Sequence, residues 1–285
     1  MTEAQEELRF IELCSDTTFK YLYKNERCRK WFNNIIKSKF NLDLDNYTLV
    51  DNELNTGNKK KDYRLDINLK KDDINIIIEM NNSYYDFLNS KNYQYLYRIA
   101  GSLYQEGENY SNKQAKLVLF NNFKNKKLPD IKTGNFILED PINNLVIDDI
   151  ESFEIYLPNF ENICYHNANK EDISLSLFTC KSYDEMKART NNPDDLEIIK
   201  ELERLAMDEN FIFDYDVEKV RKKTENSIRL DGYHAGVEEG IKEGLEKGSR
   251  EEKLNIAKSM LDEKIDIKII SKCTDLSIEE IDKLK

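Results

Sequence analysis

The sequence predicts a mixed α/β core followed by a helical C-terminal region. Short apolar runs typical of strands alternate with helical periodicity in the first half of the chain, and later segments are charged with apolar residues three and four apart. The order of predicted core elements is helix, three strands, helix, strand. We expect a core over residues 1–165, a helical extension over 166–230, and a tail over 231–285 that opens with a glycine-periodic helix.

Composition narrows the class of protein. The 285 residues are 39% hydrophobic, which is enough for a sizeable core, and 43 Lys and Arg against 55 Asp and Glu give a net charge of −12. No apolar run approaches the ~18–20 residues of a membrane helix. The N-terminus lacks the layout of a signal peptide. We therefore expect a soluble, cytoplasmic protein without a membrane partner.

Cysteine and histidine counts restrict the chemistry. The five cysteines are an odd, scattered set without CxxC spacing, which argues against a disulfide framework or a thiolate zinc site. The only two histidines, His166 and His234, lie far apart, which argues against zinc hydrolases and Ser-His-Asp triads. Any catalysis should depend on carboxylates, lysines and a hard cation.

The N-terminal elements follow from apolar spacing. Ser15 or Asp16 could cap a helix whose apolar residues run three and four apart to Ile36. Residues 47–54 have strand character, and residues 55–62 form a basic, turn-rich loop. These elements precede the most informative part of the sequence.

A hairpin brings two acids together. Residues 64–70 and 74–80 read as strands joined by a turn at 71–73, and the second strand is continuously apolar, as in a strand buried on both faces. With a two-residue turn, paired positions add up to 145, so that Asp66 lies opposite Glu79 and Arg64 opposite Asn81 on the same face. Their Cβ atoms would lie only ~5 Å apart.

Two carboxylates this close repel unless a positive charge lies between them. Mg²⁺ prefers one or two carboxylates plus water and phosphate oxygens, so a divalent cation is the natural compensation. Such an ion would activate water for attack on a phosphodiester. The alternative is a hairpin whose acids lie at its solvated end, paired with Arg64.

The remaining elements are mostly helical. Ser83 and Asp86 resemble a capping box for a helix over residues 84–106, with Gly107 as a stop. Further strands are expected at 115–120, 136–139 and 152–157, the last two at sheet edges; further helices are expected at 194–207, 217–229, 253–261, 267–272 and 278–284. Ser277 and Glu280 form a capping box for the last helix.

A family resemblance supports the metal interpretation. Asp66, a twelve-residue gap, then Glu79-Met80-Asn81 resembles the D…(D/E)xK pattern of PD-(D/E)XK nucleases. The chain most resembles the Rpn family, the recombination-promoting nucleases also labelled PD-(D/E)XK nuclease family transposases. The resemblance covers nearly the whole chain and is carried by SDTTFKYLY, RLDINL, IIIEMN, YRIAGSLYQEGENY, GVEEGIKEGLEKG and NIAKSMLDEKIDIKIISKCTDLSIEEIDKL.

The resemblance implies a restriction-endonuclease-like (PD-(D/E)XK) core and Mg²⁺-dependent (or Mn²⁺- or Ca²⁺-supported) DNA cleavage, in a recombination, mobile-element or defence context. Asp66 and Glu79 fall on the metal-binding acids, and the Met80 carbonyl is a third ligand. Asn81 falls where most of the superfamily has Lys and Rpn-like sequences commonly have Gln; an amide can hold the attacking water but carries no charge. Asp16 falls on a recurrent acid of the first helix, where a capping role is an equal alternative.

DNA contacts must come from local patches, because the net charge opposes nonspecific affinity. Four basic residues that lead into the Asp66 strand are candidate phosphate contacts: Lys59, Lys60, Lys61 and Arg64. Lys91 and Arg98 on the long helix could face the acids. Tyrosines on and after that helix could stack on bases, although their helical spacing favours core packing.

The tail invites two interpretations. Glycines every four residues from Gly232 to Gly248 are costly in a helix, so they mark either a smooth helix-packing stripe or a flexible spacer. No strand and no GxxxxGK[ST] pattern accompany them, so no nucleotide cofactor is expected. The last three helices have the size of a helix-turn-helix. We rank protein contact or homodimerisation through these helices above DNA recognition.

Three functions are consistent with these features. The leading one is a metal-dependent endodeoxyribonuclease. The second is a nuclease-fold protein with weak or no catalysis that binds DNA or a protein partner, for which Asn81 is the best support. The third is a regulatory protein whose tail binds DNA while its core is structural.

Overall fold

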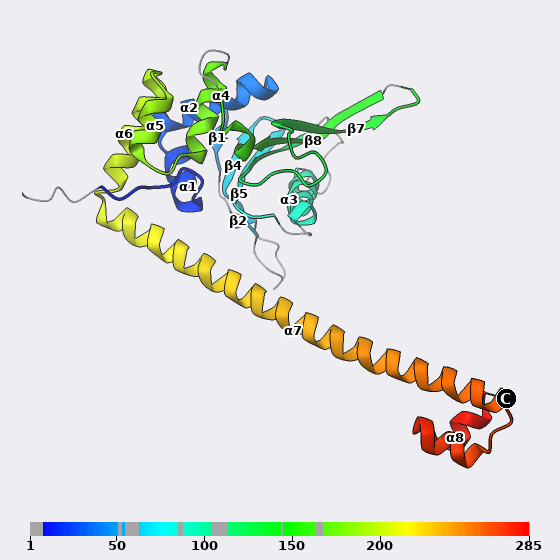
Figure 1. Cartoon of the computed structure of the whole chain (residues 1–285). Coiled ribbons are helices and arrows are strands. Elements are labelled where there is room, and N and C mark those ends of the chain that lie inside the picture. Colours follow the sequence, from blue (N-terminus) through cyan, green and yellow to red (C-terminus); the bar gives the residue numbers. More distant parts are fainter. Residues whose placement is uncertain are drawn as a thin grey trace, which may run out of the picture. The chain divides into compact units, whose positions relative to one another are not determined.

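The chain forms two compact units, Met1–Glu218 and Lys219–Lys285, in the computed structural model shown in Figure 1. The structure describes residues 8–50, 53–54, 63–84, 88–103, 113–143, 145–163 and 168–284.

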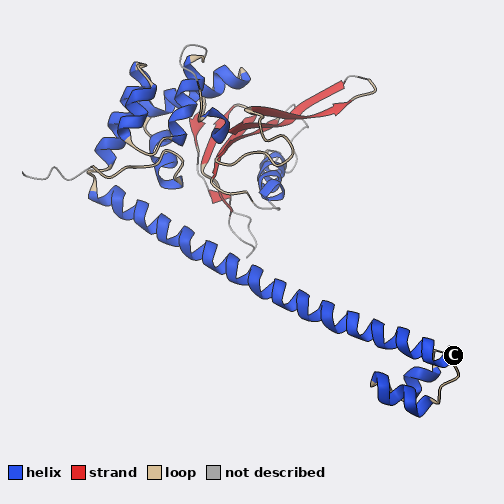
Figure 2. Ribbon diagram, in the orientation of Figure 1, coloured by secondary structure: helices blue, strands red, loops and turns tan. Residues whose placement is uncertain are grey.

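A six-stranded mixed sheet forms the centre of the first unit (Figure 2). Its strands occur in the order β1-β4-β5-β6-β8-β7. β5 and β6, and β6 and β8, pair in parallel, whereas the outer pairs are antiparallel. The strand bounds are β1 Thr48–Leu49, β4 Ile67–Lys71, β5 Ile74–Asn81, β6 Gln114–Asn121, β7 Thr133–Asp140 and β8 Leu145–Tyr156; β2 Glu53–Leu54 and β3 Tyr63–Arg64 pair separately.

The predicted hairpin is confirmed in its turn and in the register of β4 with β5, but the predicted pairing of Arg64 with Asn81 is wrong, because Arg64 pairs with Glu53 in the separate β2–β3 sheet. β4 pairs with β5 from Lys71↔Ile74 to Ile67↔Ile78, and these positions add up to 145 as expected. Asp72 occupies the left-handed region with φ 49°, which a two-residue hairpin turn requires. The first predicted strand is interrupted, because the backbone bends at Asp66 between β3 and β4.

Helices cover both faces of the sheet. α3 (Leu88–Ser102) packs on the face that carries Ile77 and Leu117, and the other helices of the unit pack on the face that carries Ile76 and Ile78. The helices of the second face are α1 Asp16–Lys24, α2 Glu26–Phe40, α4 Lys170–Ser176, α5 Tyr183–Arg189 and α6 Pro193–Leu205. Successive residues of β5 alternate between the faces, so a continuously apolar strand is buried on both.

Several boundaries differ from the sequence prediction. The first helix is divided at Asn25, which ends α1 and caps α2 with its side chain. The strand expected over 47–54 is two short strands in different sheets. The strand expected at an edge over 152–157 is instead interior, because β8 lies between β6 and β7. The helix expected over 84–106 is described as α3 over Leu88–Ser102; Asp86 and Gly107 lie outside the described residues.

The helical extension belongs to the first unit rather than forming a separate region after residue 165. Leu175, Phe178, Ile198 and Leu202 join the same apolar cluster as α1 and α2. The division between units falls instead after Glu218, within α7 (Glu209–Asp262), whose first turns contribute Tyr215 to that cluster. The extension belongs to the first unit because the apolar faces of α4, α5 and α6 are buried in the same cluster as those of α1 and α2.

The second unit contains the remainder of α7, then α8 (Ile267–Thr274) and α9 (Ile278–Asp282). The glycine series lies inside α7, and a Cβ added at any of these five glycines would meet open space. The Ser277–Glu280 capping box of α9 is present in both directions. No helix in the described residues combines the length and apolar character that crossing a membrane requires.

Candidate active site

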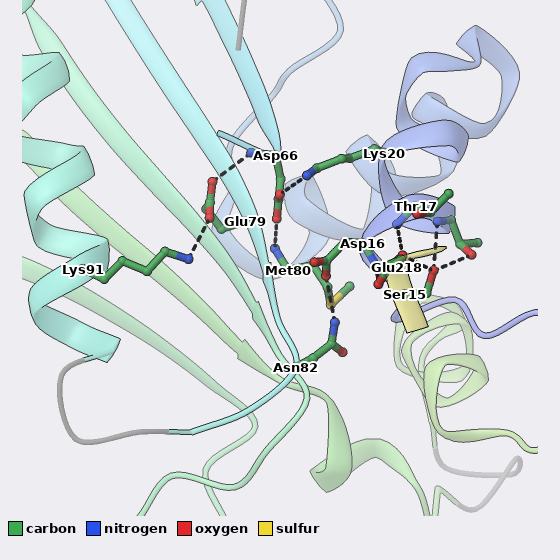
Figure 3. A network of polar contacts seen from close by, with 11 residues as sticks. Ser15, Asp16, Thr17, Lys20, Asp66, Glu79, Met80, Asn82, Lys91 and Glu218 are labelled. Carbon is green, nitrogen blue, oxygen red and sulfur yellow. Dashed lines mark hydrogen bonds and ion pairs between the residues drawn. The ribbon is translucent and has the colours of Figure 1, made fainter. Parts of the chain in front are cut away.

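The two acids of the hairpin are bonded to each other's strands where β4 and β5 separate (Figure 3). The Asp66 backbone N–H donates to Glu79 Oε1 at 2.9 Å, and the Met80 N–H donates to Asp66 Oδ2 at 3.0 Å. Asp66 is 7% exposed and Glu79 2%. Just beyond the last ladder pair, each carboxylate therefore accepts a hydrogen bond from the backbone of the opposite side of the hairpin.

Each carboxylate also meets a lysine from a different helix. Lys20 Nζ on α1 lies 2.6 Å from Asp66 Oδ1, and Lys91 Nζ on α3 lies 3.6 Å from Glu79 Oε2 (Figure 3). α1 and α3 cover opposite faces of the sheet, so the acids are approached from both sides. Lys91, predicted as a phosphate contact, thus lies beside the acid pair.

The ionised form of Glu79 is energetically unfavourable at its buried position. Burial raises the pKa of Glu79 above its ordinary value, and the neighbouring Asp66 charge raises it further. Lys91 and the hydrogen bond from the Asp66 N–H act in the opposite direction without cancelling the shift. A cation at this position would relieve the cost of the two charges.

Asn81 takes part in a buried polar chain at the carboxyl ends of three strands. Its Nδ2 donates to Asn121 Oδ1 at 3.0 Å, and Asn121 Nδ2 donates to Glu154 Oε2 at 3.4 Å. Tyr156 also donates its hydroxyl to Glu154. Burial raises the pKa of Glu154, and this acid accepts from both donors. These hydrogen bonds orient the Asn81 amide toward β6.

The N-terminus of α1 is fixed beside the acids. Ser15 is the N-cap, accepting from the Thr18 N–H, so Asp16 is the first helical residue rather than the cap. Asp16 Oδ1 instead accepts from Asn82 Nδ2 at 3.0 Å, directly after β5. Glu218, near the start of α7, accepts from the backbone N–H groups of Asp16 and Thr17 at 3.0 and 2.7 Å.

Comparison with known protein families gives a match at the end of the chain. Residues 250–285 match the family model described as Rpn/YhgA-like nuclease family, C-terminal HTH domain. This match to the last part of the chain supports membership of the Rpn/YhgA-like nuclease family. The match lies in the second unit, so the Rpn assignment comes from the tail, independently of the acids in the first unit. No curated protein and no solved structure matches the chain significantly.

The Rpn match changes the interpretation of the tail. The matched segment comprises the end of α7, α8 and α9, which enclose a small core of Ala257, Ile270, Leu276 and Ile281. The sequence alone ranks protein contact above DNA recognition for these helices. A helix-turn-helix is a DNA-reading motif, so the match favours the opposite order.

The other predicted DNA contacts fall into two groups. Lys59, Lys60 and Lys61 lie outside the described residues, and the structure describes Arg64 only as part of β3. Arg98 lies exposed on α3. Whether these residues contact DNA stays a prediction. Among the tyrosines, Tyr95 is buried and Tyr97 is exposed; Tyr104 and Tyr110 lie outside the described residues.

Three residues of this region were not predicted from the sequence: Lys20, Asn121 and Glu218. Lys20 could have been found, because it follows Asp16 by four residues on the same helix face and lies in a stretch that carried the family resemblance. Asn121 ends an apolar strand in the same way as Asn81, which is a weaker signal. Glu218 gave no local signal, because its partners lie about two hundred residues away in sequence.

The residues around the acid pair fit a hard divalent cation. Two carboxylates and the Met80 carbonyl are oxygen donors, the type that Mg²⁺ and Ca²⁺ prefer. Within the described ranges, no group of three or more His, Cys, Asp and Glu side chains could hold a metal. Two carboxylates with the remaining positions left to water and phosphate oxygens suit Mg²⁺ rather than a closed zinc site.

Proposed function

We propose that this Rpn-family protein is an endonuclease that uses Mg²⁺ or Mn²⁺ to hydrolyse phosphodiester bonds in DNA. The observation that carries the proposal is the interlocked pair Asp66 and Glu79, buried where β4 and β5 separate and faced by ammonium groups. Family membership supports a nuclease-type function independently.

The chain's own groups have distinct roles in this proposal. Asp66, Glu79 and the Met80 carbonyl hold the ion, which when bound lowers the pKa of water and offsets charge on the phosphate. Lys91 reduces repulsion between the acids and the DNA backbone. The Asn81 amide accepts a hydrogen bond from the attacking water. The water oxygen loses a proton to solvent and bonds to phosphorus while an ester P–O bond breaks; the leaving oxygen keeps the electron pair and takes up a proton from solvent.

Plasmid nicking tests the proposal. Supercoiled plasmid is incubated with the full chain in Mg²⁺ or Mn²⁺, with EDTA as the metal-free control, and with Asp66→Asn and Glu79→Gln in parallel. We expect both substitutions to reduce nicking at least about 100-fold, because each removes a charge that the ion requires. Their folding is checked by circular dichroism.

A matched control is Glu151→Gln. Glu151 is also a buried acid on the same sheet and is paired with Lys116, but it contacts neither hairpin acid in any described interaction. Nicking by Glu151→Gln should resemble that of the wild type. Equal nicking by Asp66→Asn and the wild type would contradict the proposal, because cleavage would then arise elsewhere or from a contaminant.

The second candidate is a protein that binds DNA without cleaving it. The observation that favours it is that residue 81 lacks a charge and donates its amide N–H to Asn121. Gel shifts in Ca²⁺ and in Mg²⁺ separate the two candidates. Retained binding with no nicking in either Mg²⁺ or Mn²⁺ would support this second candidate.

The tail has its own proposed role. The helix-turn-helix match supports DNA binding by α8 and α9, and deletion after Arg229 should then weaken DNA affinity. Full affinity after the deletion would contradict this role. Tyr233, Val237, Ile241 and Leu245 recur every four residues on α7 and are exposed. They support a homodimer through α7, which light scattering of the full chain and the deletion would test.

A further inference from the structure

Residue 81 cannot supply the positive charge that the PD-(D/E)XK pattern places there. Asn81 is an uncharged amide, and its Nδ2 is bonded to Asn121, which is bonded in turn to the buried Glu154. The amide can accept a hydrogen bond but cannot stabilise the negative charge that develops on a phosphate under attack. An active site of this kind needs an ammonium from another element.

Lys20 brings an ammonium to the same carboxylate. Its Nζ lies 2.6 Å from Asp66 Oδ1, while Asp66 Oδ2 accepts from the Met80 N–H (Figure 3). The Lys20 side chain is 30% exposed against 10% for that of Asp66, so the lysine contacts the acid while part of its side chain stays accessible. This is the geometry of a charge held in place by an acid and presented to an anion.

The helix that carries Lys20 is fixed on several sides. Phe19, the preceding residue, is fully buried against Phe32 and Phe120. Ser15 caps the helix, and Glu218 accepts from its first two N–H groups. Because α1 is held in this way, Lys20 reaches Asp66 from a rigid element, which is what precise charge placement requires.

Lys91 is the weaker candidate. Its Nζ is 3.6 Å from Glu79 Oε2, which is beyond hydrogen-bond length, and it also lies over the Tyr95 ring at 5.2 Å from the centroid. Lys91 therefore reduces the charge of the acid pair from a distance, whereas Lys20 makes a direct bond.

We propose that Lys20 supplies the ammonium that residue 81 lacks, contacting a non-bridging oxygen of the phosphate that is cleaved while Asp66 holds it in place. The inference rests on the proposed nuclease function. It assigns to α1 a charge that the family pattern assigns to β5. Asp66 then has two roles, because it holds both the ion and the ammonium.

The test compares four variants of the full chain in the nicking assay. Lys20→Met removes the charge and should lower the cleavage rate at saturating DNA about 100-fold or more. Lys20→Arg keeps the charge and should retain more activity than Lys20→Met. Lys91→Met should have a smaller effect than Lys20→Met. Lys24→Met, an exposed lysine one turn further along α1, should cleave like the wild type.

Ca²⁺ binding by calorimetry without DNA is the second readout. Lys20→Met should bind Ca²⁺ at least about threefold more tightly than the wild type, because a positive charge beside Asp66 is removed. Loss of Ca²⁺ binding in Lys20→Met would instead assign Lys20 a structural role and overturn the proposal. Asp66→Asn should bind Ca²⁺ more weakly.

The outcomes separate this inference from the proposed function. Wild-type cleavage that Lys20→Met retains in full would overturn the role of Lys20 alone. A wild type that binds Ca²⁺ but never cleaves would overturn the nuclease function and the role of Lys20 together. Reduced cleavage with tighter Ca²⁺ binding in Lys20→Met would support both.

Discussion

Glu218 should be a major contributor to the stability of the first unit. It is 7% exposed and accepts from the N–H groups of Asp16 and Thr17 at 3.0 and 2.7 Å. These donors belong to the first turn of α1 and have no partner within the helix. A hydrogen bond to a charged group contributes about 1.5–3 kcal/mol. Allowing for water that replaces part of the loss, Glu218→Ala should lower the free energy of unfolding by about 3 kcal/mol.

Fluorescence of Trp31 is the appropriate assay. It is the only tryptophan of the chain and is buried in the first unit, so its signal reports unfolding of that unit alone. Guanidinium titrations of the wild type and Glu218→Ala give the difference in free energy. Cleavage should fall together with stability, because α1 carries Lys20.

Asp216→Ala is the matched control for Glu218→Ala. Asp216 lies two residues earlier on α7 and pairs with Arg9 in the same N-terminal segment, but this pair is 41% and 48% exposed. Exposed pairs of this kind contribute less than about 1 kcal/mol. If Glu218→Ala costs no more than Asp216→Ala, the reasoning from burial and bonding is refuted.

Three further predictions follow from other residues. Burial and the Asp66 charge raise the pKa of Glu79 in the folded state, so the folded chain binds the Glu79 proton more tightly than the unfolded chain. The contribution of this proton to the free energy of unfolding is therefore lost as pH rises from about 5 to 8. Glu79→Gln should flatten this decline in Trp31-monitored stability; an unchanged slope would contradict it. Asp195 is fully buried and accepts from an indole N–H and two hydroxyls, so Asp195→Ala should cost about 3 kcal/mol or more in the same titration, and a cost below about 1 kcal/mol would count against it. Ser277→Ala removes the capping box of α9 and should cost about 1 kcal/mol locally; hydrogen exchange should accelerate in α9 and not in the first unit.

Local rules predicted the hairpin correctly. A two-residue turn and the period of two along a strand were sufficient to place Asp66 beside Glu79, and the register agrees at every described pair of β4 and β5. Ser277 was identified as a cap, and Ser15 was one of two candidate caps with Asp16, because capping depends on residues within one turn.

Contacts between distant segments could not be predicted in this way. Lys20 is separated from Asp66 by more than forty residues, and neither local sequence indicates the other. The same holds for Glu218, whose partners belong to α1. The interior position of β8 was missed because its sequence alternates like that of an edge strand, whereas its neighbours are set by the crossover from β6.

The glycine series within α7 has a consequence for how ligand binding to this helix would be detected. Each glycine favours the coil by about 1 kcal/mol relative to alanine, and five of them are spaced over residues 232–248 with their surroundings open. Such a stretch lies near the balance between helix and coil. A ligand that binds only the helical form would therefore slow amide exchange across the whole stretch. Replacing Gly240 with alanine would increase the affinity for that ligand without adding a contact.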